Sequence, residues 1–133
     1  MRKCFFSFLL IGMIILAAAP GTQSAELVMV ERDGCAWCAA FDREIAPVYG
    51  KTEEGRRAPL RRIELGHTPS DLGFVAVDRF TPEFIMVDRG REIGRIRGYP
   101  GPEGFWTQLA MLMRELDAAA GEQQASNPVL PTD

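Results

Sequence analysis

The spacing of apolar residues predicts a strand and a helix at the start of the folded part of the chain. Residues 26–32 (ELVMVER) are short, apolar and partly β-branched, which favours a buried strand. A helix is predicted from about Cys35, because apolar side chains then recur every three or four residues while charged side chains take the opposite side. Pro47 is expected to bend or end this helix. The predicted buried face consists of Cys38, Phe41, Ile45 and Val48.

The next segment predicts a second strand between two polar connections. Residues 51–59 (KTEEGRRAP) read as a polar loop, and residues 60–65 (LRRIEL) read as a strand. Within residues 67–74 (HTPSDLGF), Thr68 can cap a helix and Pro69 suits its first position. We therefore expect one short helix in this connector.

In the second half of the chain, the pattern predicts a hairpin and a long amphipathic helix. Residues 84–88 (FIMVD) read as a strand, and residues 91–99 (REIGRIRGY) as its antiparallel return. The three-residue DRG turn between them offers Gly90 for a positive φ. Residues 101–120 predict the closing helix, whereas residues 121–133 lack periodicity and are expected to form a flexible tail. The inner stripe of the helix is predicted to be Phe105, Leu109, Leu112 and Leu116, with Trp106 and Met113 beside it.

This order of elements predicts an α/β fold. A β-α-β unit requires parallel strands with a right-handed crossover, and the hairpin adds an antiparallel pair. The prediction is a mixed four-stranded sheet with helices on both faces, formed by one domain at residues 26–120. Cys35 then follows the carboxyl end of the first strand, where chemistry is expected in such sheets.

The N-terminus has the three parts of a secretory signal peptide. A positive MRK tripeptide precedes seventeen residues without a charge, and small and polar residues follow. We expect residues 1–25 to be a signal peptide that is cleaved after Ala25 or Ser24. An uncleaved anchor is the alternative, although the apolar run is at the short end for spanning a bilayer. Export would place the protein where disulfides persist.

Charge and length restrict the function of the exported chain. Loss of residues 1–25 would remove two of the 15 basic residues and no acidic one, leaving 13 against 18 and a net charge of −5. Basic residues neither gather in one block nor alternate with aromatic residues, so a nucleic acid partner is not expected. About 108 residues remain, which suffice for one modest core.

Cys35 and Cys38 are separated by two residues, and three uses of such a pair are considered. Structural zinc needs four Cys or His ligands, whereas the exported chain has these two cysteines and His67. A purely structural disulfide would close a very small loop and stabilise little. A redox dithiol fits best, because a helix N-terminus stabilises a Cys35 thiolate and Cys38, one turn further in, can attack a mixed disulfide. The redox-active disulfide would then serve as the reactive group, and no cofactor is predicted.

The motif CAWC after a strand, followed by TPEFIMVDRGREIGRIRGY and an amphipathic helix, resembles the thioredoxin superfamily over residues 26–118. The resemblance implies that Pro82 is cis, which would leave the backbone of Thr81 free to pair with a substrate peptide. A trans proline at a strand entry is the alternative. The resemblance also implies that Gly98 lets the backbone of a partner come close.

Two aromatic residues occupy positions that the resemblance places beside Cys35. Trp37 precedes Cys38, and Tyr99 follows Gly98. Both suit a shallow apolar docking surface for a client protein. Partial packing in the core is the alternative for each.

The sequence departs from thioredoxin at positions that handle protons. Met29 stands where thioredoxin has a buried acid, and Ala-Trp replaces Gly-Pro between the cysteines. Proton transfer on Cys38 must then use water or another acid, and Glu31 is the nearest candidate in sequence. Glu31 is nevertheless interpreted as an exposed charge at the strand end, and His67 as a loop residue rather than a base.

The direction of electron flow is predicted from what the chain lacks. CAWC has no histidine of the kind that stabilises the thiolate in strong oxidants of this superfamily, and neither a helical insertion nor a dimerisation module is present. We expect a monomeric periplasmic reductase that takes electrons from a membrane electron carrier and keeps a client cysteine reduced. RFTPEF, GREIGRI and GYPG make the chain similar to small periplasmic thioredoxins found with sulfur-oxidation systems. A thiol oxidase and a non-catalytic thioredoxin-fold adaptor are the alternatives.

Overall fold

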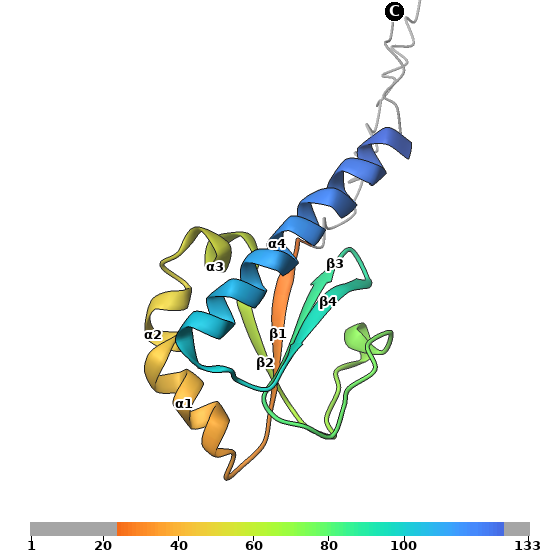
Figure 1. Ribbon diagram of the computed structural model, residues 1–133. Coiled ribbons are helices and arrows are strands. Elements are labelled where there is room, and N and C mark those ends of the chain that lie inside the picture. The colour runs from red at the N-terminus through yellow and green to blue at the C-terminus, as the bar shows by residue number, and fades with distance from the viewer. Residues whose placement is uncertain (1–23, 127–133) are drawn as a thin grey trace, which may run out of the picture.

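The computed structural model describes residues 24–126, and its elements follow the predicted order (Figure 1). The strands are β1 (Glu26–Glu31), β2 (Leu60–Glu64), β3 (Glu83–Asp88) and β4 (Arg91–Arg97). The helices are α1 (Ala36–Glu44), α2 (Ala46–Tyr49), α3 (Glu53–Arg57), the 3₁₀ helix η1 (Ser70–Leu72) and α4 (Gly101–Ser126). A β-α-β unit is thus followed by a short connector helix and a β-β-α unit, as the hydrophobic pattern indicated.

The four strands form one mixed sheet in the order β2-β1-β3-β4. β1 runs parallel to β2 and antiparallel to β3, and β3 pairs with β4 as an antiparallel hairpin. Val30 near the end of β1 pairs with Glu83 at the start of β3, and Glu83 pairs with Arg97 at the end of β4. The segments after β1, before β3 and after β4 therefore meet at one edge of the sheet, which we call the site edge.

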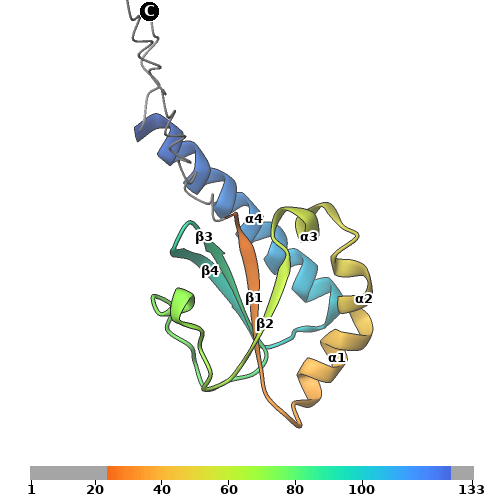
Figure 2. The same ribbon diagram turned by 180° about the vertical axis from the view of Figure 1, so that it is seen from behind.

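Helices α1, α2 and α4 cover one face of the sheet, and η1 lies over the other (Figure 2). An aromatic cluster fills the space under the helices: the centroid of the Phe41 ring lies 4.7 Å from that of Phe84 and 5.3 Å from that of Phe105. On the second face, Leu72 of η1 packs against a smaller apolar cluster that includes Val28. Burial of these side chains is the main driving force for this fold, and it fixes α1 against the sheet.

The segment after α1 differs in detail from the prediction. The chain leaves the α1 helix at Ile45, and Pro47 lies in the first turn of α2. This break shifts the helical phase, so Tyr49 is buried while Val48 is exposed, the reverse of the predicted Val48 position. The predicted loop at residues 51–59 contains α3, which begins where the Thr52 hydroxyl accepts the Gly55 N–H at 3.0 Å.

Three further details correct the prediction. The β3–β4 turn has two residues, Arg89 and Gly90, with φ values of 48° and 73°, as in a type I′ turn. η1 has no side-chain cap, so Thr68 does not take the predicted capping role. α4 continues to Ser126, which makes residues 121–126 helical.

Parts of two predicted segments lie outside the described residues. These are most of the predicted signal peptide and residues 127–133 of the predicted tail. Within residues 24–126, no helix combines the length and apolar character needed to cross a membrane.

Candidate active site

Cys35 occupies the N-cap position of α1, in the short turn that connects β1 to this helix. Gly34 before it has a φ of 72°, a left-handed conformation that glycine adopts without strain, and this residue turns the chain into the helix. Cys35 Sγ accepts the Cys38 N–H at 3.1 Å, so the sulfur takes the place that a Ser or Asp oxygen usually has at a helix start. The two cysteines are joined by a disulfide. After reduction, the free N–H groups and the positive end of the α1 dipole would stabilise a Cys35 thiolate.

The two sulfur-bearing residues differ in accessibility. Cys35 is half-buried and packs against the edge of the larger apolar cluster, whereas Cys38 is 4% exposed and belongs to that cluster. A client sulfur can therefore reach Cys35 more readily than Cys38. The predicted roles, with Cys35 attacking and Cys38 resolving, fit this difference in burial.

A shallow hollow of about 420 Å³ lies beside the disulfide, and Cys35, Cys38, Glu31 and Asp42 are among the residues that line it. Arg62 of β2 binds both carboxylates of this group, and its Nη1 lies 2.7 Å from Glu31 Oε2. Glu31 is thus held by an ion pair on the wall of the hollow that both cysteines share.

The other residues considered for proton transfer lie elsewhere. Met29 is fully buried in the larger cluster and has no ionisable group. His67 is exposed, with its Nδ1 3.5 Å from Glu64 Oε2, and it does not line the hollow. The structure therefore places His67 in a surface loop, as the sequence favoured.

Residues 79–82 lead into β3 at the site edge, and we call them the Pro82 loop. The Thr81–Pro82 peptide bond is cis, and the Pro82 carbonyl accepts the Gly98 N–H at 2.9 Å. Gly98 has a φ of 77°, and an added Cβ would meet no atom within 4 Å, so the space beside it is open. The first three residues of the loop make no backbone hydrogen bond to any of residues 24–126. Backbone groups of Thr81 are therefore available for pairing with another chain.

Exposure separates the aromatic residues near the site. Trp37 is 64% exposed, and so is Phe80 of the Pro82 loop at 73%, a residue that the sequence did not single out. Tyr99 is buried: its ring meets that of Phe41 edge-on, and its hydroxyl donates to Glu44 Oε2 at 2.6 Å. Burial and this hydrogen bond raise the pKa of the Tyr99 hydroxyl. Tyr99 therefore offers little surface to a partner, whereas Trp37 and Phe80 offer apolar surface at the site edge.

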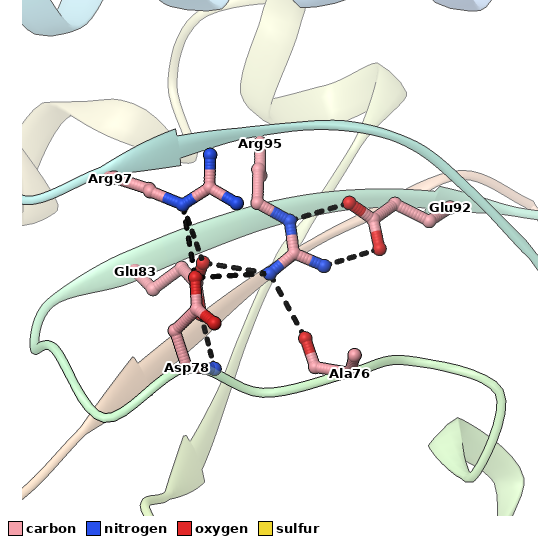
Figure 3. Close-up of polar contacts among 6 residues, drawn as sticks. All are labelled: Ala76, Asp78, Glu83, Glu92, Arg95 and Arg97. Carbon is pink, nitrogen blue, oxygen red and sulfur yellow. Dashed lines mark hydrogen bonds and ion pairs between the residues drawn. The ribbon is translucent and has the colours of Figure 1, made fainter.

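A buried charged group lies beside the Pro82 loop, and the sequence did not predict it (Figure 3). Glu83 is 0% exposed; its Oε1 accepts from Arg95 Nη1 at 2.8 Å and its Oε2 accepts the Asp78 N–H at 3.1 Å. Arg95 also bonds both carboxylate oxygens of Glu92 and donates to the Ala76 carbonyl at 2.9 Å. The hydrogen bond with Glu92 and, to a smaller extent, the one with Glu83 raise the pKa of Arg95. One feature of the sequence could have indicated this buried group: Glu83 directly follows Thr-Pro, at the entry of an otherwise apolar strand.

The chain is similar to solved structures of thioredoxins. The chain is similar to the periplasmic thioredoxin SoxS from Paracoccus pantotrophus in its reduced form: identity is 41%, the match covers 69% of this chain and 98% of that chain, and the TM-score is 0.66. A thioredoxin of Malassezia sympodialis, Mala s 13, is 18% identical over 68% of this chain and 79% of that chain. Its TM-score of 0.51 supports the fold alone. No protein-family model and no curated protein matches the chain.

Proposed function

Because this chain belongs to the thioredoxin superfamily, we propose that it is an exported reductase that keeps the cysteine of a periplasmic client protein reduced. It is a thioredoxin-like thiol-disulfide oxidoreductase with a CxxC pair. The observation that carries the reductase proposal is the environment of Cys35, a half-buried sulfur at the N-terminus of α1 with one backbone donor and no neighbouring histidine in the motif. The periplasmic location of the similar thioredoxin and the predicted signal peptide support the compartment.

The proposed reaction uses both cysteines in turn. The Cys35 thiolate attacks one sulfur of a client disulfide, which forms a mixed disulfide and releases the other client sulfur as a thiolate. Cys38 then loses its proton to water or to Glu31 and attacks Cys35 Sγ. The second client sulfur leaves as a thiolate, and the Cys35–Cys38 disulfide forms. Two electrons have then passed to the client, and a donor dithiol must return them to the protein.

The direction of electron flow depends on how strongly the protein stabilises the thiolate. A strong oxidant stabilises its reduced form, which makes its disulfide easy to reduce. Here the end of α1 and one N–H act on Cys35 without help from a histidine in the motif, so the stabilisation is moderate. An attacking thiol whose pKa stays near the ambient pH remains a good nucleophile. This balance favours electron transfer from the protein to the client.

The supply of electrons is part of the same proposal. An exported protein is separated from cytoplasmic dithiols by the membrane, so a membrane electron carrier is the donor we propose. The protein acts as a monomer in this scheme, since one domain supplies both cysteines and the Pro82 loop. Client and donor would then take turns at the same exposed face around Cys35.

A redox titration against glutathione tests the direction of electron flow. We expect a reduction potential closer to the value of about −270 mV for thioredoxin than to the value of about −120 mV for a strong periplasmic oxidant. The reduced protein should also cleave insulin disulfides with dithiothreitol as donor, and Cys35→Ser should abolish this activity. A potential near the upper value would refute the reductase and favour a thiol oxidase.

Trapping separates an enzyme from a binding adaptor. In Cys38→Ser, the mixed disulfide formed at Cys35 cannot be resolved, so covalent adducts with client proteins should accumulate. A matched Cys35→Ser variant should yield none. If neither variant forms adducts, the thioredoxin-fold adaptor becomes the better description.

A further inference from the structure

We propose that Glu83 is a positioning residue, which together with Arg95 holds the Pro82 loop in the conformation that receives the backbone of a client. This inference rests on the proposed function, because it concerns docking of a protein client beside Cys35. The Glu83 carboxylate bonds Asp78, the residue before the loop, and Arg95 of β4, so its effect on the reaction passes through the position of the loop.

The Glu83 carboxylate joins the two ends of the Pro82 loop (Figure 3). Glu83 follows the loop directly, and its Oε2 accepts the N–H of Asp78, the residue before the loop, at 3.1 Å. Between these ends, the backbone of the first three loop residues has no hydrogen bond to any of residues 24–126. The second fixed point is the Pro82 carbonyl, which accepts the Gly98 N–H at 2.9 Å. The side chain of Asp78 is also held, because its Oδ2 accepts from Arg97 Nε at 3.0 Å. The conformation of the loop therefore depends on the Pro82–Gly98 hydrogen bond and on side chains that hold Asp78, and Glu83 is the one that bonds its backbone N–H.

Arg95 holds the carboxylate from the opposite side. Its Nη1 lies 2.8 Å from Glu83 Oε1 and 2.9 Å from the Ala76 carbonyl, which connects β4 to the segment before the loop. Its Nε and Nη2 bond both oxygens of Glu92, and this two-point contact fixes the plane of the guanidinium group. A small rotation of Glu83 would break at least one of these hydrogen bonds.

Stability alone does not account for a charged pair at this place. Glu83 is 0% exposed and the Arg95 side chain 12%, so both groups have lost most of their hydration. Replacing a buried ion pair with apolar side chains of similar size is often neutral or even stabilising. What a fully bonded charged network provides is one defined geometry. The Glu83–Arg95 network defines the geometry of the Pro82 loop, and this loop presents Thr81 to a client.

Single-turnover kinetics with two disulfide substrates test this proposal. The reduced protein is mixed with insulin or with the small disulfide bis(2-hydroxyethyl) disulfide, and its oxidation is followed by tryptophan fluorescence. In Glu83→Gln the side chain keeps its size, but one of its two oxygens becomes an NH2 group, which would face either the Asp78 N–H or Arg95 donor to donor. We expect the half-saturating insulin concentration to rise on the order of tenfold, because a displaced loop docks the client poorly. The limiting rate and the rate with the small disulfide should change far less.

A matched control lies on the same strand. Asp88 is also a buried acid of β3 with an arginine partner, its Oδ2 being 2.7 Å from Arg89 Nε, but it lies at the end opposite the site edge. Asp88→Asn should therefore leave both insulin constants unchanged. If Glu83→Gln binds insulin like the wild type, or slows both substrates equally, the positioning role is wrong.

Hydrogen exchange of the wild-type protein tests the contact between Glu83 and Asp78 even if Glu83→Gln does not fold. The Asp78 amide should exchange at least about tenfold more slowly than the amides of Arg79 and Phe80, because it alone donates to a buried carboxylate. Equal exchange of the three amides would contradict the proposal. A wild-type protein that reduces neither disulfide would refute the reductase function, and the exchange pattern would still report on Glu83.

Discussion

Selective alkylation of the reduced protein tests the roles of the two thiols. Two features stabilise a Cys35 thiolate, namely the Cys38 N–H at 3.1 Å and the positive end of α1. A hydrogen bond to a charged group contributes about 1.5–3 kcal/mol and a helix end about 0.3–1 kcal/mol. Because Cys35 is only half-buried, water competes for the sulfur, and we take about 2 kcal/mol as the net effect. This value corresponds to roughly a thirtyfold larger ratio of thiolate to thiol.

Iodoacetamide labelling near pH 7, followed by peptide mass spectrometry over time, measures this preference. Cys35 should be alkylated at least about tenfold faster than Cys38, because Cys38 is 4% exposed and its sulfur lacks the helix-end environment. Cys38→Ser should be labelled at the wild-type rate of Cys35, whereas Cys35→Ser should be labelled slowly until denaturant is added. Equal rates for the two thiols, or earlier labelling of Cys38, would refute this account of the site.

Three further results are expected. Trp37→Ala should raise the half-saturating insulin concentration several-fold at an unchanged melting temperature, since the side chain is exposed beside Cys35; an unchanged concentration would exclude a docking role. Tyr49→Phe should lower the free energy of unfolding by about 1–2 kcal/mol in urea, because the buried hydroxyl donates to the Ala58 carbonyl at 2.7 Å. Burial, with a smaller effect of Glu54, raises the Tyr49 pKa above its unfolded value, so wild-type stability should fall above about pH 10 and this variant should lose part of that dependence. Reduction of the disulfide should not raise the melting temperature, and a clearly more stable reduced form would favour a thiol oxidase.

The order of elements and the place of the cysteines were predictable, because both depend on local patterns. Residues 27–30 form a short apolar run, residues 60–65 place three apolar side chains between two polar connections, and the stripe from Phe105 to Leu116 repeats at helical spacing. Each pattern persists long enough for its period to identify the element. The position of Cys35 at a helix start then follows from where the first strand ends.

Details that depend on contacts between distant segments were not predictable in this way. Tyr49 replaces Val48 in the core because the chain leaves the helical phase at Ile45, one turn earlier than the apolar spacing indicated. Tyr99 is buried because its ring packs against Phe41 of α1, and its hydroxyl bonds Glu44, 55 residues away in sequence. No periodic pattern encodes either event.

The two sides of the site depend on different parts of the chain. On one side, the environment of Cys35 is made by backbone groups: the left-handed turn at Gly34 and the N–H groups of α1. Substitutions of neighbouring side chains leave such groups in place, so this backbone contribution to the stability of the thiolate persists. On the other side, the proposed geometry of the Pro82 loop is made by the side chains of Glu83 and Arg95. Substitutions at these two positions can therefore change which clients dock while the redox chemistry of Cys35 stays the same.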